Sequence, residues 1–347
     1  MDAMIEQTPR AQTPPMLSVR GLHTRFYKDD AVIHAVNGMS LDLWPGEVLG
    51  LVGESGCGKS VTALSILRLI PRAVGRVVEG EIRFEGRDLL ALTPRELASV
   101  RGRDISMIFQ EPMTSLNPVL RVGDQVAETL QLHQGLSRRA ALARAIELLD
   151  LVRIADPARQ AREYPHRLSG GMRQRVMIAM ALACEPRLMI ADEPTTALDV
   201  TVQAQILELM ADLNRQTGAA ILMITHDLGV VAEMADRVIV MYAGNAVEEA
   251  TVHDLFASPL HPYTRGLMAA IPRRGAWRGG AGAQTLQEIP GMVPSLRSPI
   301  AGCAFARRCA YATARCHEHA PARQVRPNGH AVACWEADRM EQLGKPI

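Results

Sequence analysis

The sequence predicts an α/β protein built around a parallel β-sheet. Short apolar runs of the kind that form buried parallel strands recur along the chain, and segments with helical spacing separate them. The runs are VLGLVG at 48–53, RLMIA at 187–191, AAILMIT at 219–225 and RVIVMY at 237–242. Helical spacing covers 60–70, which stops at a proline, and 200–218, which ends in glycine. Strands that alternate with helices indicate a parallel sheet.

Other segments add to this plan. Residues 1–15 contain three prolines and two acidic side chains without an apolar core, which predicts a short disordered tail. Between 16 and 43, LSVRGLHTRF and HAVNGMSLDL alternate apolar and polar residues, as strands of a half-exposed sheet do. Charged helical patterns dominate about 88–166, for example at 137–151, and predict a helical subdomain. We therefore expect a main domain at 16–273.

A glycine-rich segment, RRGAWRGGAGAQ, follows Pro272 and is typical of a linker. The remaining residues, 274–347, show little apolar periodicity and contain four of the six cysteines. We expect them to form a separate small C-terminal extension.

Composition excludes several classes of protein. The 347 residues carry a formal net charge of only +1 and 4% aromatic residues, which argues against a broad nucleic-acid surface or a stacking platform. The sequence contains no run of about 18 apolar residues, so it predicts no transmembrane helix. We expect the chain to stay in the cytoplasm, where disulfides are disfavoured.

The segment GESGCGKS, at 53–60, fits the P-loop pattern and follows a predicted strand. Its glycines let backbone N–H groups turn inward toward phosphate, and the following helix N-terminus adds its dipole. Lys59 should reach the β- and γ-phosphates of ATP, and the Ser60 hydroxyl should hold Mg²⁺. The residues expected to cradle the nucleotide are Gly53, Ser55, Gly56, Cys57, Gly58, Lys59 and Ser60.

Two carboxylates end another apolar run, LMIADEP, at 188–194. Asp192 suits Mg²⁺, directly or through water, and Glu193 can orient or deprotonate an attacking water. Without the P-loop, this segment would be interpreted as an exposed strand end that carries two solvated carboxylates. Beside a P-loop, it predicts the other half of an ATPase site.

Further motifs carry a family resemblance over about 16–272. LSGGMRQR, at 168–175, resembles the signature motif of ABC ATPases, although Met172 stands where glutamine is usual. Gln110, TTALD at 195–199 and His226 match the Q-loop, the D-loop and the switch histidine of that family. The resemblance implies a P-loop ABC ATPase with an antiparallel β subdomain, a helical insertion and a small cysteine-containing extension.

The resemblance also implies roles for residues. Ser169, Gly170 and Gly171 would bind the γ-phosphate of ATP held by a second ABC subunit. His226 would contact that phosphate and help to hold Glu193 and the water. Gln110 would sense the nucleotide and contribute to the Mg²⁺ site.

The sequence allows more than one role for two aromatic residues and for one cysteine. Phe26, or else Tyr27, would stack on adenine; the alternative is an aromatic packed at the edge of a sheet. Cys57 is either a thiol with a pKa lowered by the helix N-terminus or a small filler side chain.

Several segments resemble ATPases of the dipeptide/oligopeptide importer group, which also serves nickel uptake. They are REYPHRLSGG, EPMTSLNP, SPLHPYTRGLMAAIP, EIPGMVPSL and GCAFARRC. The resemblance implies a pair of similar ATPases, two membrane permease subunits and an external solute-binding protein, with this chain at the cytoplasmic face of the membrane. Peptides are the expected solutes; nickel or another small solute is the alternative.

Four cysteines, Cys303, Cys309, Cys316 and Cys334, are separated by five, six and seventeen residues. Clustered cytoplasmic cysteines favour metal over disulfide, although this spacing is not that of a paired zinc knuckle. Tails of this importer group hold a [4Fe-4S] cluster, so the resemblance implies one here. Zinc and free thiols are the alternatives.

Two rival functions account for less of the sequence. A soluble ABC ATPase acting on DNA or ribosomes would usually carry two cassettes or a long coiled-coil insertion. An iron–sulfur redox enzyme would leave the signature motif and His226 unexplained.

Overall fold

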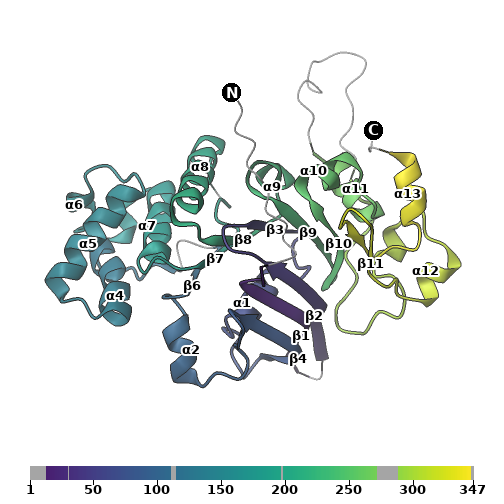
Figure 1. Cartoon of the computed structure of the whole chain (residues 1–347), viewed down its shortest axis with the longest axis horizontal. Helices are drawn as coiled ribbons and strands as arrows, with labels where there is room; N and C mark the ends of the chain where they lie inside the picture. The colour runs from purple at the N-terminus through teal and green to yellow at the C-terminus, as the bar shows by residue number, and fades with distance from the viewer. Residues whose placement is uncertain (1–12, 30, 111–114, 197, 272–287, 345–347) are drawn as a thin grey trace, which may run out of the picture.

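The computed structural model describes residues 13–29, 31–110, 115–196, 198–271 and 288–344. Most of the predicted N-terminal tail, the first half of EPMTSLNP and the whole predicted glycine-rich linker lie outside these ranges. Figure 1 shows the described chain as three regions around a central sheet. A helical region lies on the left, an antiparallel sheet below, and the C-terminal residues on the right.

The antiparallel sheet has the strand order β2-β1-β4-β5. β1 (Leu17–Lys28) pairs with both β2 (Ala31–Leu43) and β4 (Gly75–Phe84), and β5 (Arg87–Asp88) forms one edge. Residues alternate between buried and more exposed positions along much of β1, as the sequence pattern predicts. The two predicted strands at 16–43 are therefore confirmed.

The main sheet has the order β11-β12-β10-β9-β3-β8-β7-β6, in which β10 spans Asn245–Thr251, β11 Gln324–Val325 and β12 Ala331–Val332. Its parallel part consists of β6 (Ile105–Ile108), β7 (Leu188–Asp192), β8 (Ala220–Thr225), β3 (Val48–Val52) and β9 (Arg237–Tyr242). Every residue of β3, β7, β8 and β9 is buried. The parallel pairings confirm the predicted parallel sheet. Its strands are buried because helices and the second sheet cover both of its faces.

Helices between these strands begin and end where local signals place them. α1 (Lys59–Ile66) begins directly after the glycine-rich loop, and α9 (Leu228–Met234) follows β8. α8 (Val200–Thr217) begins at Asp199, whose side chain accepts from the Val202 N–H, and ends at Gly218 with a φ of +65°. Among the described residues, no helix is long and apolar enough to cross a bilayer.

The helical region consists of α4 (Val122–Gln134), α5 (Arg138–Leu151), α6 (Pro157–Gln160) and α7 (Gly170–Leu182). The predicted subdomain at 88–166 includes α4, α5 and α6 but not α7, and it is not wholly helical. It also contains α2 (Pro94–Val100) and β6, the edge strand of the main sheet. β6 has only four residues, too few for an apolar run to stand out among charged helical patterns.

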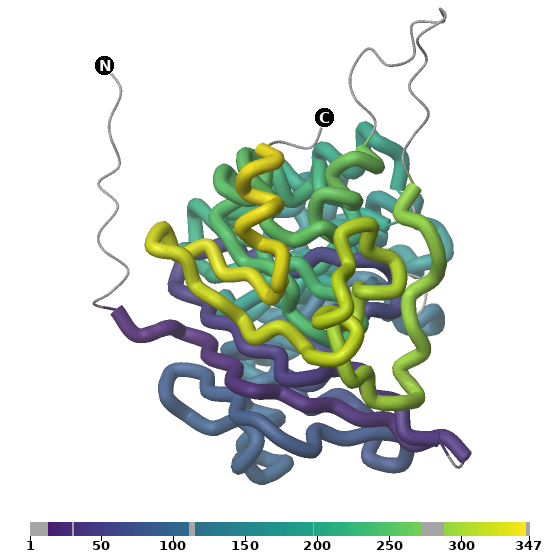
Figure 2. The backbone as a smooth tube through the Cα atoms, turned by 90° about the vertical axis from the view of Figure 1, so that its right-hand side faces the viewer, coloured from purple at the N-terminus to yellow at the C-terminus, as the bar shows by residue number. Residues whose placement is uncertain are grey.

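The C-terminal residues continue the main sheet, contrary to the expectation of a separate module. β12 (Ala331–Val332) pairs with β10 (Asn245–Thr251) and with β11 (Gln324–Val325). α10 (Val252–Ala257) and α11 (Pro262–Ala269) precede this extension, and α12 (Ala314–Glu318) and α13 (Ala337–Leu343) belong to it. Figure 2 shows the extension running over the main body. Two-residue strands carry no periodic signal, so the sequence did not reveal the pairing.

An aromatic cluster fixes the extension to the body. The Phe305 ring lies 5.2 Å from Tyr242 and 5.4 Å from Tyr263, between ring centroids, and 5.8 Å from His261. All four side chains are buried. Such contacts stabilise a fold both by removing apolar area from water and by favourable ring geometry.

Replacing Phe305 with alanine is expected to lower the free energy of unfolding by about 3–5 kcal/mol, the usual cost of deleting a buried aromatic ring. Thermal unfolding of the full chain would measure this. Met292→Ala is the control, because Met292 is in the same extension but 89% exposed. Equal unfolding midpoints for the two variants would contradict the proposed role of the ring.

Candidate functional site: a phosphate-binding loop beside paired carboxylates

The P-loop connects β3 to α1 and depends on glycines. Gly53, Gly56 and Gly58 have φ angles of +156°, +79° and +104°. A Cβ on Gly53 would lie 2.2 Å from the Met241 carbonyl oxygen, and one on Gly58 would lie 2.3 Å from that of Ala35. Since only glycine fits these two positions, the loop can follow the tight course that turns its N–H groups toward an anion.

Lys59 is held within this loop. Its side chain is buried, and Nζ donates to the carbonyl oxygens of Gly53 at 2.8 Å and Glu54 at 3.1 Å. These bonds hold the ammonium group against the loop that is expected to bind phosphate. A phosphate oxygen entering the loop would meet a positive charge that is already in place.

Ser60 and Asp192 lie together, as the sequence predicted for a magnesium site. The Ser60 hydroxyl donates to Asp192 Oδ1 at 3.0 Å. Burial raises the pKa of Asp192 to about 6, although the hydrogen bond from Ser60 opposes this shift. A hydroxyl and a carboxylate oxygen are the ligands that Mg²⁺ takes beside phosphates, so the donor set fits that ion.

Glu193 lies at the centre of a small network at the end of β7. Its Oε2 accepts from Gln110 Nε2 at 3.0 Å and from the Thr196 hydroxyl at 2.9 Å, and its Oε1 lies 3.2 Å from His226 Nδ1. Burial alone would raise the pKa of Glu193, but the hydrogen bonds from Thr196 and His226 lower it overall. An ionised carboxylate held in this way can orient a water and accept its proton.

The network brings together three residues that the sequence singled out, Gln110, Glu193 and His226. It also contains Thr196, which sequence reasoning missed as a Glu193 partner. Thr196 lies within the TTALD motif, three residues after Glu193, so the proximity in sequence was a usable signal. Glu193 itself has a φ of +48°, a strained backbone for a residue other than glycine.

The signature motif begins helix α7. Ser169 caps the helix by accepting from the Met172 N–H at 3.3 Å, so Met172 does not disturb the start of the helix. Ser169 and Gly170 are exposed. In the described part of the chain, no hydrogen bond joins the signature to the P-loop. The start of the motif is thus accessible on the surface.

Phe26 and Tyr27 lie on β1. Phe26 pairs in register with Gly75 of β4 and is partly buried. The Tyr27 ring is 40% exposed and has the Arg76 guanidinium carbon 5.2 Å from its centroid. An adenine-stacking role for Phe26 stays a prediction.

Cys57 is fully buried inside the P-loop. Burial raises the pKa of its thiol, and the charge of Lys59 offsets only part of that shift. The interpretation as an activated thiol is therefore not supported, and Cys57 acts as a small packing residue.

The iron–sulfur expectation for the four tail cysteines is corrected by the structure. The four side chains line one cavity of about 10 Å³, room for a single water at most. Within the described ranges, no group of three or more His, Cys, Asp or Glu side chains is arranged to hold a metal ion. Burial raises the pKa of Cys309 to about 11 and that of Cys334 to about 12, which keeps these thiols neutral. They are free cysteines that pack the extension.

A P-loop, a strand ending in two carboxylates and a surface signature helix together define an ATPase of the ATP-binding cassette class. The family model described as "ABC transporter" matches residues 36–196, and the model "Oligopeptide/dipeptide transporter, C-terminal region" matches 247–316. The chain belongs to the ABC transporter ATP-binding family, whose ATP hydrolysis is coupled to transport.

Curated relatives match over nearly the whole chain. A probable peptide ABC transporter ATP-binding protein of Sinorhizobium fredii is 56% identical, covering 98% of this chain and 99% of the relative. The dipeptide transport ATP-binding protein DppD of Bacillus subtilis is 50% identical over 93% and 95% of the two chains. The dimeric cassette MJ0796, solved with ADP and Pi, has a TM-score of 0.62 at 30% identity, covering 68% and 99%.

Proposed function

We propose that this chain is the ATP-binding and ATP-hydrolysing subunit of an importer for oligopeptides or dipeptides. One observation carries the proposal: a complete ATPase site and a C-terminal region of the oligopeptide/dipeptide transporter type occur in the same chain. Relatives named as peptide or dipeptide transport ATP-binding proteins support the same solute class.

Each site residue has a separate role in ATP hydrolysis. The P-loop N–H groups and Lys59 would bind the phosphates, and Ser60 and Asp192 would hold Mg²⁺. Gln110 contacts Glu193 and would sense what occupies the site. When bound, Mg²⁺ offsets the negative charge of the phosphates. Glu193 orients the attacking water and takes its proton, while His226 and Thr196 keep the carboxylate in place.

A second, similar ABC subunit completes the site. Ser169, Gly170 and Gly171 present helix N–H groups at the surface, where the γ-phosphate of ATP held by another subunit would bind. The dimeric state of the solved cassette MJ0796 supports this arrangement. We propose a heterodimer with a distinct but related ATPase as the working form.

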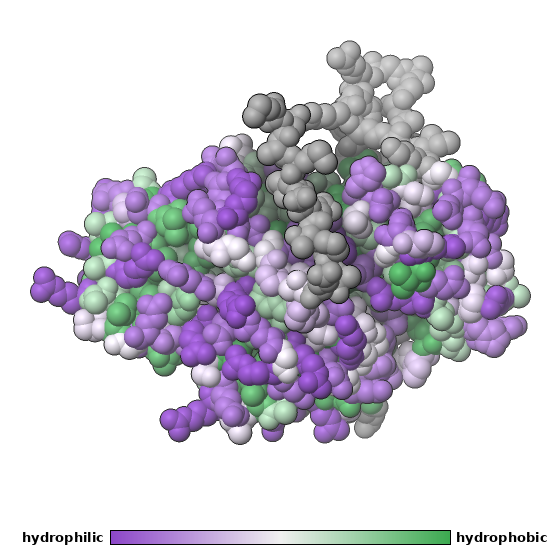
Figure 3. Space-filling model, in the orientation of Figure 1, coloured by the Kyte–Doolittle hydropathy of each residue, from purple (hydrophilic) through white to green (hydrophobic). Residues whose placement is uncertain are grey.

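The remaining partners are two membrane permease subunits and an external solute-binding protein, which place this chain at the cytoplasmic face of the membrane. The helical region exposes apolar side chains suited to docking, among them Leu132 of α4, which is 75% exposed. Figure 3 shows apolar patches among hydrophilic surface at this end of the molecule.

Uptake assays in cells lacking this subunit would test the solute. We expect uptake of labelled dipeptides and tripeptides to disappear and to return with the wild-type chain or with Glu81→Gln, an exposed substitution on β4. Glu193→Gln should not restore uptake. Unchanged peptide uptake with loss of labelled nickel uptake would overturn the peptide assignment and favour a nickel importer.

A further inference from the structure

The C-terminal extension contacts the P-loop through one arginine. Arg308, at the end of the short helix η3 (Ala306–Arg308), forms a two-pronged ion pair with Glu54, the second residue of the P-loop. Its Nη1 donates to Glu54 Oε2 at 2.6 Å and its Nη2 donates to Oε1 at 3.0 Å. Paired parallel bonds of this kind fix direction as well as distance.

The Arg308 guanidinium is itself held rigidly. Nε donates to the Pro290 carbonyl at 2.9 Å, Nη2 to that of Ile289 at 3.1 Å, and Nη1 to the Tyr242 hydroxyl at 3.3 Å. With the two bonds to Glu54, these contacts use all five donors that an arginine has. The Arg308 side chain is 6% exposed and that of Glu54 is 27% exposed, so water reaches the pair only in part. Arg308 therefore presents a fixed charge to the P-loop.

Glu54 is held at three points. Besides its carboxylate, its N–H donates to the Tyr263 hydroxyl at 2.8 Å, and its carbonyl oxygen accepts from Lys59 Nζ at 3.1 Å. A movement of the Glu54 backbone would thus move the carbonyl that Lys59 contacts. The extension is coupled in this way to the group that meets the phosphates.

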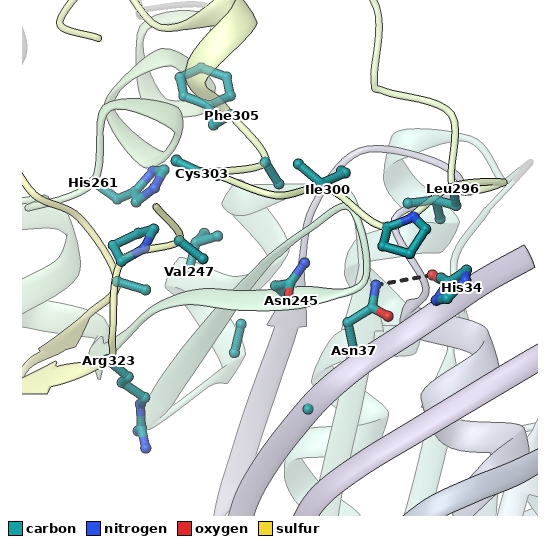
Figure 4. A pocket seen from close by; sticks show the side chains of 18 of the residues that line it. His34, Asn37, Asn245, Val247, His261, Leu296, Ile300, Cys303, Phe305 and Arg323 are labelled. Carbon is teal, nitrogen blue, oxygen red and sulfur yellow. Dashed lines mark hydrogen bonds between the residues drawn. The ribbon is translucent and has the colours of Figure 1, made fainter. Parts of the chain in front are cut away.

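Elsewhere the boundary between the extension and the body is partly hollow. A cavity of about 620 Å³ lies between strands β2 and β10 and the extension, and Figure 4 shows side chains that line it. His34, Asn37, Asn245, Val247, Leu296, Ile300 and Cys303 are among the residues that line it. Within the described ranges, every side-chain hydrogen bond from 288–344 to the P-loop comes from Arg308.

We propose that Arg308 is a positioning residue for ATP binding: the C-terminal extension sets the conformation of the P-loop through the Arg308–Glu54 pair. The pair keeps Glu54, and with it Lys59, in the geometry that accepts phosphate. ATP affinity then depends on an extension that provides none of the groups expected to touch the nucleotide.

Titration of the full-length chain with ATP and Mg²⁺, by displacement of a fluorescent ATP analogue, would test this. Arg308→Gln and Glu54→Gln should each weaken ATP binding by about 10-fold, and the double variant should be no weaker than either single one, since both remove the same pair. Arg308→Lys keeps the charge but cannot make the two-pronged contact with Glu54. Its ATP affinity should lie between those of wild type and Arg308→Gln.

Arg323→Gln is the matched control. Arg323 belongs to the same extension and pairs with Glu249 of β10, away from the P-loop. It should leave ATP affinity within 2-fold of wild type. Arg308→Gln also loses buried hydrogen bonds, so its ATP affinity is measured at a temperature well below its own unfolding midpoint without nucleotide. Additive effects of the two P-loop pair substitutions, or unchanged ATP affinity in Glu54→Gln, would overturn the proposal.

Discussion

Replacing Glu193 with glutamine is expected to lower ATP hydrolysis by the assembled transporter by about 100-fold or more, since loss of a positioned general base typically costs 10²–10⁴-fold. Glutamine keeps the size of the side chain and can still accept from Gln110 and Thr196. It cannot take a proton from water. ATP binding by the P-loop should therefore persist while turnover stops.

Steady-state phosphate release and ATP affinity, measured on the same preparations, would separate the two effects. Glu81→Gln is the control, because it removes an exposed carboxylate from β4 and should leave both quantities unchanged. Undiminished hydrolysis by Glu193→Gln would show that another group activates the water.

The same variant provides a test of the proposed dimer. ATP that is bound but not hydrolysed should hold the two ATPase subunits together, which sedimentation would detect. Adding Ser169→Arg should prevent this association, because a bulky cation would fill the space at the start of α7 where phosphate is expected. Association that is unaffected by Ser169→Arg would contradict the assigned role of the signature.

Replacing Lys59 with alanine is expected to weaken ATP binding by about 100-fold or more. Hydrogen bonds to charged groups contribute about 1.5–3 kcal/mol each, and Lys59 should make such bonds to two phosphates. The substitution also removes the donor that the Gly53 and Glu54 carbonyl oxygens share. Hydrolysis should fall with affinity.

Equilibrium titration with ATP would measure the loss. Arg139→Ala, at an exposed position of helix α5, removes the same charge away from the site and should change affinity by less than 2-fold. Comparable losses in the two variants would mean that general charge, and not a phosphate contact, accounts for the Lys59 effect.

Local patterns in the sequence determined much of this protein. The fully buried parallel strands β3, β7, β8 and β9 coincide with short apolar runs, and the P-loop and signature are contiguous segments whose backbone supplies the binding groups. Asp192 and Glu193 follow directly from the strand that carries them. Such features depend on neighbours along the chain, so composition and spacing reveal them.

Only the tertiary structure decided which distant residues meet. Gln110 contacts Glu193 across 83 positions, and Arg308 contacts Glu54 across 254. The extension joins the main sheet through two-residue strands. Its four cysteines line a small cavity and do not form the metal cluster that the resemblance implied. Contacts of this kind depend on how separate elements pack, and single-chain spacing carries no record of that geometry.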